Sequence, residues 1–253
     1  MKFATVCALL ALLAGPARAQ FLQAVPPNSG ASCEQRADIM YKWLQDWPNL
    51  ARYAAADGPL EREVEPRRLV FLGDSITDGW NLGRWFPGKP YVNRGISGQT
   101  TSQMLLRFEQ DVVGLHPGAV VILAGTNDIA GNTGPMTLEQ IERNFAAMTA
   151  IARANRISVV IESVMPVNDY TPNAKRFFAE RPMEKIRALN AWLRDFAQHE
   201  GYVYVDYFSA MLDEHGLLRG ELADDGLHPN AKGYTLMVKL LEPAIESALP
   251  ATK

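Results

Sequence analysis

Short apolar runs alternate with longer segments of helical period along most of this 253-residue chain, and this alternation limits the folds open to it. The runs are apolar almost throughout, as strands buried on both faces of a parallel sheet should be. Helices that connect such strands cover the two faces of the sheet. The pattern therefore predicts an α/β fold with a parallel sheet. Its strands are expected at residues 69–72, 91–93, 119–123, 158–164 and 202–205.

Capping signals mark where the helices begin. A serine or threonine followed three residues later by glutamine can form a capping box, in which each partner satisfies an N–H group of the other. The segments that follow carry apolar residues at helical spacing. The longest loop between these periodic elements is expected at 166–182, where long loops are usually functional or mobile. Helices are expected after Ser32, Thr100 and Thr137, from Met183 to a stop at Gly201, and over 231–248.

The first 19 residues have the order of a secretory signal peptide. Lys2 precedes an apolar stretch, and small residues at 17 and 19 follow it. We expect cleavage between Ala19 and Gln20, and hence a secreted or periplasmic protein. The apolar stretch is too short to span a bilayer of about 30 Å, so no stable membrane anchor is expected.

Cleavage would leave 234 residues, about one domain in size. Residues 20–66 are expected to form an N-terminal lead-in and an additional helix, the one that follows Ser32. Residues 67–250 are expected to form the main domain. The loss of Lys2 and Arg18 takes the formal charge from −3 to −5, and no cluster of lysine and arginine is present, which argues against a nucleic-acid partner. Cys33 would be the only cysteine, so no intrachain disulfide is expected.

Four polar motifs follow strands or lie in a loop near the C-terminus. In an open parallel sheet, ligands bind beyond the carboxyl ends of the strands, so these motifs are expected to gather at one edge. They are GDSIT (73–77), GISGQT (95–100), GTND (125–128) and DGLHPN (225–230).

Three of the residues in these motifs suit nucleophilic catalysis. His228 can accept a proton from a hydroxyl through one ring nitrogen and donate to Asp225 through the other. Ser75 would be the hydroxyl that this base activates. The alternative is that Ser75 and Asp225 only form turns, which is the commoner role of such residues after strands. Asp74 is expected to hold the Ser75 loop through backbone hydrogen bonds.

Three donors could stabilise an oxyanion beside Ser75. The N–H of Gly98 lies just before a capped helix, where positive backbone charge collects. The side-chain amide of Asn127 and the N–H of Ser75 would complete the set. Separately, Gly98 could relieve a tight turn and Asn127 could cap a loop. Their joint placement after successive strands favours the catalytic interpretation.

The motifs GDSITDGW, GISGQT, GTND and DGLHP resemble the four blocks of the GDSL, or SGNH, hydrolase family. Ser75, Gly98, Asn127 and His228 match the four lettered positions in order, and Ile76 stands conservatively where the signature has leucine. The resemblance implies a three-layer α/β/α flavodoxin-like sandwich with a five-stranded parallel sheet. It also implies ester hydrolysis without metal or other cofactor, with Ser75 as nucleophile, His228 as base, Asp225 as its partner, and Ser75, Gly98 and Asn127 as oxyanion hole.

Within the family the chain looks most similar to bacterial lipolytic acylhydrolases and to the catalytic subunit of platelet-activating-factor acetylhydrolase. The Gly-x-Ser-x-Gly elbow of the ordinary α/β-hydrolases is absent. No histidine pair has the spacing of metal ligands. The leading interpretation is a secreted serine esterase.

The substrate is expected to be a small-molecule or glycan ester. Trp80, Trp85 and Phe86 could line an apolar pocket, or could equally pack in the core. Loops rich in glycine and proline suggest an open site and short acyl chains. A carbohydrate O-acetyl esterase, an acyltransferase on the same residues and, least favoured, a non-catalytic binding module are the alternatives. Nothing in the sequence indicates an oligomeric state.

Overall fold

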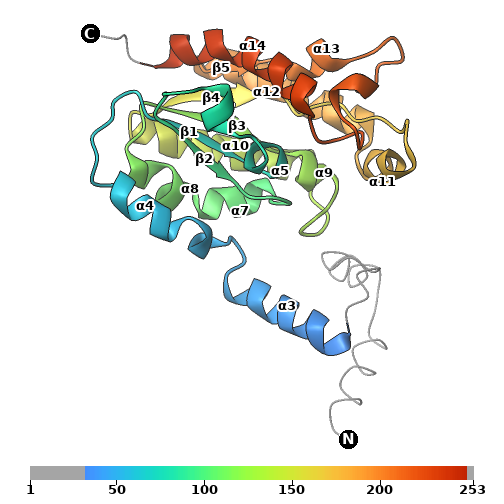
Figure 1. Cartoon of the computed structure of the whole chain (residues 1–253), viewed down its shortest axis with the longest axis horizontal. Helices are drawn as coiled ribbons and strands as arrows, with labels where there is room; N and C mark the ends of the chain where they lie inside the picture. Colours follow the sequence, from blue (N-terminus) through green and yellow to red (C-terminus); the bar gives the residue numbers. More distant parts are fainter. Residues whose placement is uncertain (1–31, 250–253) are drawn as a thin grey trace, which may run out of the picture.

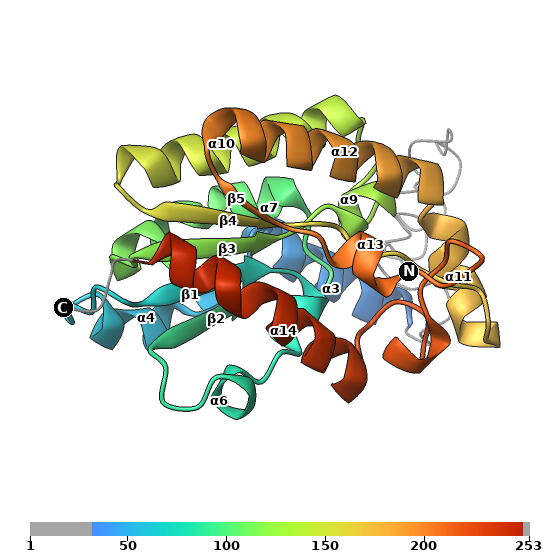
Figure 2. The same cartoon turned by 90° about the horizontal axis from the view of Figure 1, so that it is seen from above.

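A computed structural model describes residues 32–249, and the expected signal peptide and the start of the lead-in lie outside this range. Five parallel strands form one sheet in the order β2-β1-β3-β4-β5, with helices on both sides (Figures 1 and 2). The expected three-layer sandwich with the flavodoxin-like strand order is therefore confirmed. The strands are β1 (Leu69–Gly73), β2 (Tyr91–Gly95), β3 (Ala119–Leu123), β4 (Ser158–Glu162) and β5 (Val203–Val205).

Successive residues of the central strands point to opposite faces and enter two separate cores. Val70 and Leu72 of β1 face one core, whereas Leu69 and Phe71 face the other. The first core lies under α7 (Thr101–Leu106), α8 (Phe108–Asp111), α10 (Leu138–Ala154) and α12 (Met183–Glu200). The second lies under α6 (Leu82–Trp85), α13 (Tyr207–Met211) and α14 (Ala231–Ala248). Figure 2 shows α10 and α12 on one side of the sheet and α14 on the other.

Most of the expected helix boundaries are confirmed. Capping boxes form at Ser32, before α3 (Cys33–Gln45), and at Thr137, before α10. Gly201 ends α12 with a φ of 74°, a left-handed conformation that glycine adopts without strain. The remaining short helices are α4 (Ala54–Leu60), α5 (Ser75–Asp78), α9 (Thr126–Ile129), η1 (Leu50–Arg52), η2 (Val113–Leu115) and η3 (Gly220–Leu222).

The single helix expected after Thr100 is wrong, because the segment is broken into α7, α8 and η2. The break falls at Arg107, whose φ of −101° and ψ of 3° leave the helical region. Its buried guanidinium donates to Gln99 Oε1 (2.6 Å) and to the Gly73 carbonyl (3.1 Å), and pairs with Asp111 (2.8 Å). These tertiary contacts override the helical pattern.

The expected loop at 166–182 is also corrected, since it contains helix α11 (Pro172–Glu180). The Thr171 side chain accepts a hydrogen bond from the Ala174 N–H (3.1 Å), and Pro172 occupies the first helical position. A threonine N-cap followed by proline is a recognised helix start, so the sequence did contain this signal.

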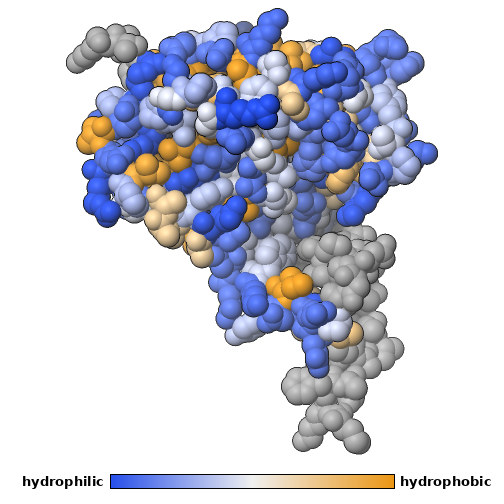
Figure 3. Space-filling model, in the orientation of Figure 1, coloured by the Kyte–Doolittle hydropathy of each residue, from blue (hydrophilic) through white to orange (hydrophobic). Residues whose placement is uncertain are grey.

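The segment before β1 is attached to the body through buried polar contacts. Asp57 is 1% exposed and pairs with Arg94 of β2. The Tyr53 hydroxyl donates to the Gly95 carbonyl. Helix α3 extends away from the sheet and its covering helices (Figures 1 and 3), and none of its residues is buried. Across residues 32–249, no helix combines the length and apolar character needed to cross a membrane.

Candidate active site

The four polar motifs meet at the carboxyl edge of the sheet. Ser75 begins α5 directly after β1, and Gly98 lies in the turn between β2 and α7. Asn127 lies in α9, two residues beyond the turn that follows β3. The loop before α14 contributes Asp225 and His228. The parallel strands and the crossovers between them therefore bring together residues that are up to 153 positions apart.

Ser75, His228 and Asp225 form one continuous hydrogen-bonded chain. Ser75 Oγ lies 2.9 Å from His228 Nε2, and His228 Nδ1 lies 2.6 Å from Asp225 Oδ2. The side chains of His228 and Asp225 are 37% and 35% exposed, so the site opens to solvent. This geometry allows His228 to take the Ser75 proton while Asp225 holds the other ring nitrogen.

The Asp225 carboxylate is stabilised by its own loop. Partial burial would raise its pKa, but hydrogen bonds from the His228 ring and from the N–H groups of His228 and Leu227 outweigh burial and lower the pKa below its usual value. Asp225 is therefore ionised at neutral pH. An ionised acceptor favours the tautomer with the proton on Nδ1, which leaves Nε2 free to accept from Ser75.

Asp74 and Gly95 shape the loop that carries Ser75. Asp74 is fully buried, and its Oδ1 accepts from the Ile76 N–H (3.0 Å). Burial raises the pKa of Asp74 to about 6, against the opposing effects of that hydrogen bond, His228 and Arg181. A Cβ on Gly95 would lie 2.1 Å from the Asp78 backbone nitrogen, so α5 can approach β2 only because residue 95 is glycine.

The three expected oxyanion donors occupy one region. Ser75 is the first residue of α5, and Gly98 has a φ of 81°. Neither N–H has a hydrogen-bond partner among residues 32–249. Asn127 Nδ2 donates to the Gln99 carbonyl (3.0 Å), but an amide nitrogen carries two hydrogens and one remains for a ligand.

Arg181 is a site residue that the sequence analysis missed. It is 3% exposed and donates from Nε to Thr126 Oγ1 (3.0 Å) and from Nη2 to Asn127 Oδ1 (3.2 Å). The second bond fixes which end of the Asn127 amide faces the site. The guanidinium also lies over the Phe177 ring, whose edge-to-face partner is His228 (5.7 Å between centroids). Arg181 follows α11, and no local pattern links it to Asn127.

Asp128 joins the GTND motif to Thr101, the residue that follows the GISGQT motif, and was likewise given no role by the sequence analysis. Its carboxylate accepts from the Thr101 N–H (3.0 and 3.1 Å) and from the Thr101 hydroxyl. Burial raises its pKa to about 6, which the Thr101 contacts oppose. The contact anchors the start of α7 beside Asn127.

Two of the three aromatic residues considered for a substrate pocket lie in the core instead. Trp80 is 1% exposed and Phe86 is 5% exposed, and both pack against Phe71. Trp85 is half-buried beside Tyr234. Of the two interpretations, the structure supports core packing for Trp80 and Phe86.

Glu162, at the end of β4, is a buried carboxyl beneath the site. It is 1% exposed and accepts from the Tyr207 hydroxyl (2.5 Å). Burial, assisted by the nearby Asp74, raises its pKa from 4.5 to about 8, although the Tyr207 hydrogen bond opposes the shift. The folded protein therefore keeps a proton on Glu162 at neutral pH.

This proton makes stability depend on pH. Between pH 4.5 and about 8, Glu162 ionises in the unfolded chain but not in the folded one, so the free energy of unfolding falls as pH rises. Glu162→Gln cannot ionise, so its free energy of unfolding should not fall with pH in this way. Since each pKa unit corresponds to about 1.4 kcal/mol, the variant should be more stable than the wild type at pH 8 by a few kcal/mol. Urea denaturation at pH 5, 6.5 and 8 would measure it, with exposed Glu184→Gln as control. Parallel pH profiles for wild type and Glu162→Gln would contradict the prediction.

Comparison with known proteins identifies the family to which the chain is similar. The model of the GDSL-like Lipase/Acylhydrolase family matches residues 71–236, about two thirds of the chain. A GDSL-like lipase of Bacteroides thetaiotaomicron has a similar structure, with a TM-score of 0.73 at 38% identity, covering 80% of this chain and 100% of that one.

Two curated relatives are also similar over most of their length. Esterase TesA of Pseudomonas aeruginosa is 26% identical over 75% of this chain and 93% of its own. Acetylxylan esterase of Geobacillus stearothermophilus is 24% identical over 68% of this chain and 90% of its own. No group of three or more histidine, cysteine and acidic side chains suited to a metal ion occurs within the described part of the chain.

The family match and the curated relatives show that the chain belongs to the GDSL-like lipase/acylhydrolase family and is a carboxylic ester hydrolase.

Proposed function

We propose that the protein hydrolyses short-chain acyl or acetyl esters through an acyl-enzyme on Ser75. The observation that carries this proposal is the unbroken chain from Ser75 Oγ through both ring nitrogens of His228 to Asp225. A nucleophile, a base and a group that orients the base are the parts that acyl transfer needs.

Ser75 Oγ attacks the ester carbonyl carbon while His228 Nε2 accepts the hydroxyl proton. The N–H groups of Ser75 and Gly98 and the Asn127 amide hold the oxyanion. The C–O bond to the alcohol then breaks, and the alcohol leaves with the proton from His228. Water repeats the sequence on the acyl-enzyme and releases the acid and free Ser75. Each oxyanion donor of this type is worth about 2.7–4 kcal/mol of transition-state stabilisation.

The preference for short acyl groups rests on the surroundings of Ser75. Trp80 and Phe86 are committed to the core, so neither is available to line a channel for a long acyl chain. The exposure of His228 indicates an open site. The curated relatives are an esterase and an acetylxylan esterase by name, which fits small acyl groups on varied alcohols.

We also propose that the protein is exported and that the mature chain begins at Gln20. The charged, apolar and small-residue order of residues 1–19 supports this. Mass spectrometry of the protein recovered outside the cytoplasm should find Gln20 at its N-terminus.

A fluorophosphonate ester tests the nucleophile directly, because it phosphonylates an activated serine and mimics the tetrahedral intermediate. We expect one equivalent to inactivate the enzyme, with the mass added to the peptide that contains Ser75. Hydrolysis of p-nitrophenyl esters should be faster for acetate and butyrate than for palmitate. Labelling of a different residue would overturn the mechanism, and faster palmitate hydrolysis would overturn the chain-length preference.

A further inference from the structure

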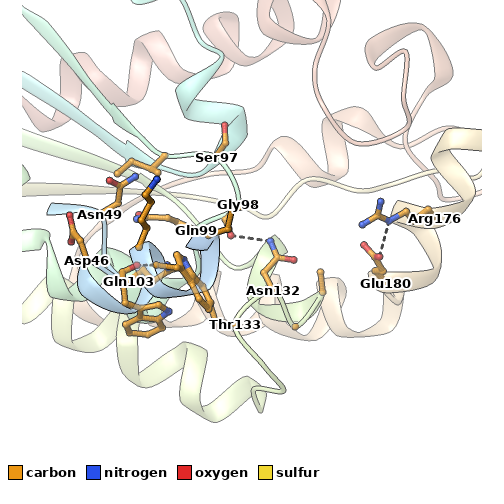
Figure 4. Close-up of a pocket in the computed structure, with 17 residues that line it drawn as sticks. Asp46, Asn49, Ser97, Gly98, Gln99, Gln103, Asn132, Thr133, Arg176 and Glu180 are labelled. Atoms are coloured by element: carbon orange, nitrogen blue, oxygen red, sulfur yellow. Dashed lines mark hydrogen bonds and ion pairs between the residues drawn. The ribbon is translucent and has the colours of Figure 1, made fainter. Parts of the chain in front are cut away.

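A cleft of about 680 Å³ opens beside Gly98, between the N-terminal segment and α11 (Figure 4). Figure 4 shows Gly98 and Asn132 between Asp46 and Asn49 on one side and the Arg176–Glu180 pair on the other. Asn132 Nδ2 donates to the Gly98 carbonyl (2.9 Å). The cleft therefore shares Gly98 with the proposed oxyanion hole, and its volume is that of a ligand site rather than of an acetyl pocket.

Two tryptophans form one wall of this cleft. Trp43 in α3 and Trp47 just after it are half-buried, and their ring centroids lie 6.5 Å apart with planes at 75°. Neither ring belongs to the two hydrophobic cores. Aromatic side chains that border a cleft and belong to no core are typical of ligand-binding sites.

The tryptophan wall is held by the GISGQT motif, which supplies Gly98, and by the helix α7 that follows it. Gln99 Nε2 donates to the Pro48 carbonyl (2.7 Å), and Gln103 Nε2 donates to the Trp47 carbonyl (2.8 Å). The Asp46 carboxylate accepts from the N–H groups of Leu50 (2.8 Å) and Ala51 (3.0 Å), which fixes the turn after α3. The wall is thus positioned relative to the oxyanion donor in advance of binding.

Each charged side chain that lines the cleft has a partner. Lys42 pairs with Asp38 (2.9 Å) and Arg176 pairs with Glu180 (3.2 Å). The Asp46 carboxylate accepts hydrogen bonds from backbone N–H groups. A ligand carrying phosphate would find no uncommitted cation among these lining residues. A long acyl chain would meet amide and hydroxyl groups from Asn49, Asn132 and Thr133. A neutral ligand with both apolar faces and hydroxyl groups fits this lining best.

We propose that this cleft binds the saccharide portion of a neutral O-acylated oligosaccharide, with a sugar ring against Trp43 and Trp47 and the ester carbonyl at Gly98. The proposal rests on the proposed function, since it names the alcohol part of the ester that Ser75 attacks. The apolar C–H face of a pyranose suits an indole ring, and its hydroxyl groups can bond to the amide side chains.

Binding can be measured without turnover in a Ser75→Ala background. Calorimetry with partially acetylated xylo-oligosaccharides should show saturable binding. Adding Trp43→Ala or Trp47→Ala should weaken this binding at least tenfold, while Trp43→Phe should recover most of it. Tyr41→Ala is the matched control, because Tyr41 lies on the same helix, is 62% exposed and does not line the cleft. Circular dichroism of each variant checks that the chain is folded.

The outcomes separate this proposal from the proposed function. Equal binding by the parent and both tryptophan-to-alanine variants, or binding of palmitoyl-CoA or lysophosphatidylcholine in place of the oligosaccharide, would overturn the cleft assignment. Ser75-dependent hydrolysis of p-nitrophenyl acetate would still support the esterase mechanism in that case. The converse result is hydrolysis that persists in Ser75→Ala, together with oligosaccharide binding that depends on the tryptophans. This result would support the cleft assignment and reject Ser75 as the nucleophile.

Discussion

Replacement of Ser75 by alanine is expected to lower kcat for p-nitrophenyl acetate by about 10³- to 10⁶-fold. The substitution removes the atom that forms the acyl-enzyme, whereas the oxyanion donors stay in place. The fold should be unaffected, because Ser75 Oγ bonds only to His228 among the described residues and the α5 cap comes from Asp74. KM should change far less than kcat.

Ser209→Ala is a suitable control for this substitution. Ser209 is an exposed serine on α13 and has no part in the proposed site, so the same chemical change is made outside it. Initial rates of both variants, with thermal unfolding to confirm folding, complete the test. If Ser75→Ala kept more than a tenth of the wild-type rate, Ser75 could not be the nucleophile.

Asp225→Asn is expected to lower kcat by about 10⁴-fold while leaving the loop intact. The asparagine oxygen can still accept from the N–H groups of Leu227 and His228, which Asp225 Oδ1 accepts now (3.0 and 2.8 Å). The neutral amide, however, no longer stabilises a positively charged imidazole. It can also donate to Nδ1, which would place the ring proton on Nε2 and block proton transfer from Ser75.

Asp224→Asn provides the matched control at the neighbouring position. Asp224 is an exposed carboxylate that accepts from the Asn230 side chain (2.8 Å) and does not touch His228. Steady-state kinetics of both variants from pH 5 to 9 would separate the two effects. Equal losses in Asp224→Asn and Asp225→Asn would point to a general disturbance of the loop and away from an orienting role for Asp225.

The sheet and most helices could be predicted because their signals are local. Ala119–Leu123 was expected with the observed bounds, since a strand buried on both faces needs continuous apolar residues. The capping boxes at Ser32 and Thr137 likewise lie within four residues of sequence. The prediction of a single helix after Thr100 was wrong because Arg107 bonds to Gly73, which is 34 positions away. Helix α11 was missed although its start signal is local, since Thr171 caps the helix and Pro172 occupies its first position.

The site residues also divide into those marked by local sequence signals and those placed by contacts between distant segments. Ser75, Gly98, Asn127, Asp225 and His228 could be chosen from four short motifs because each motif follows a strand end or lies in one loop. Arg181 could not, because its bond to Asn127 spans 54 positions and depends on where the chain after α11 lies relative to α9. No local pattern marks Trp43 and Trp47, because their position beside Gly98 depends on hydrogen bonds from Gln99 and Gln103 to the backbone of residues 47 and 48.

The amino-acid sequence by itself determined the α/β class, the strand positions and the chemistry available at the sheet edge, because periodicity, caps and reactive side chains act over a few residues. Only the tertiary structure decided which buried groups orient Asn127, which aromatic residues go to the core, and which wall faces the substrate. Those choices depend on packing and hydrogen bonds between segments far apart in the chain, whose free energies exist only once the segments meet.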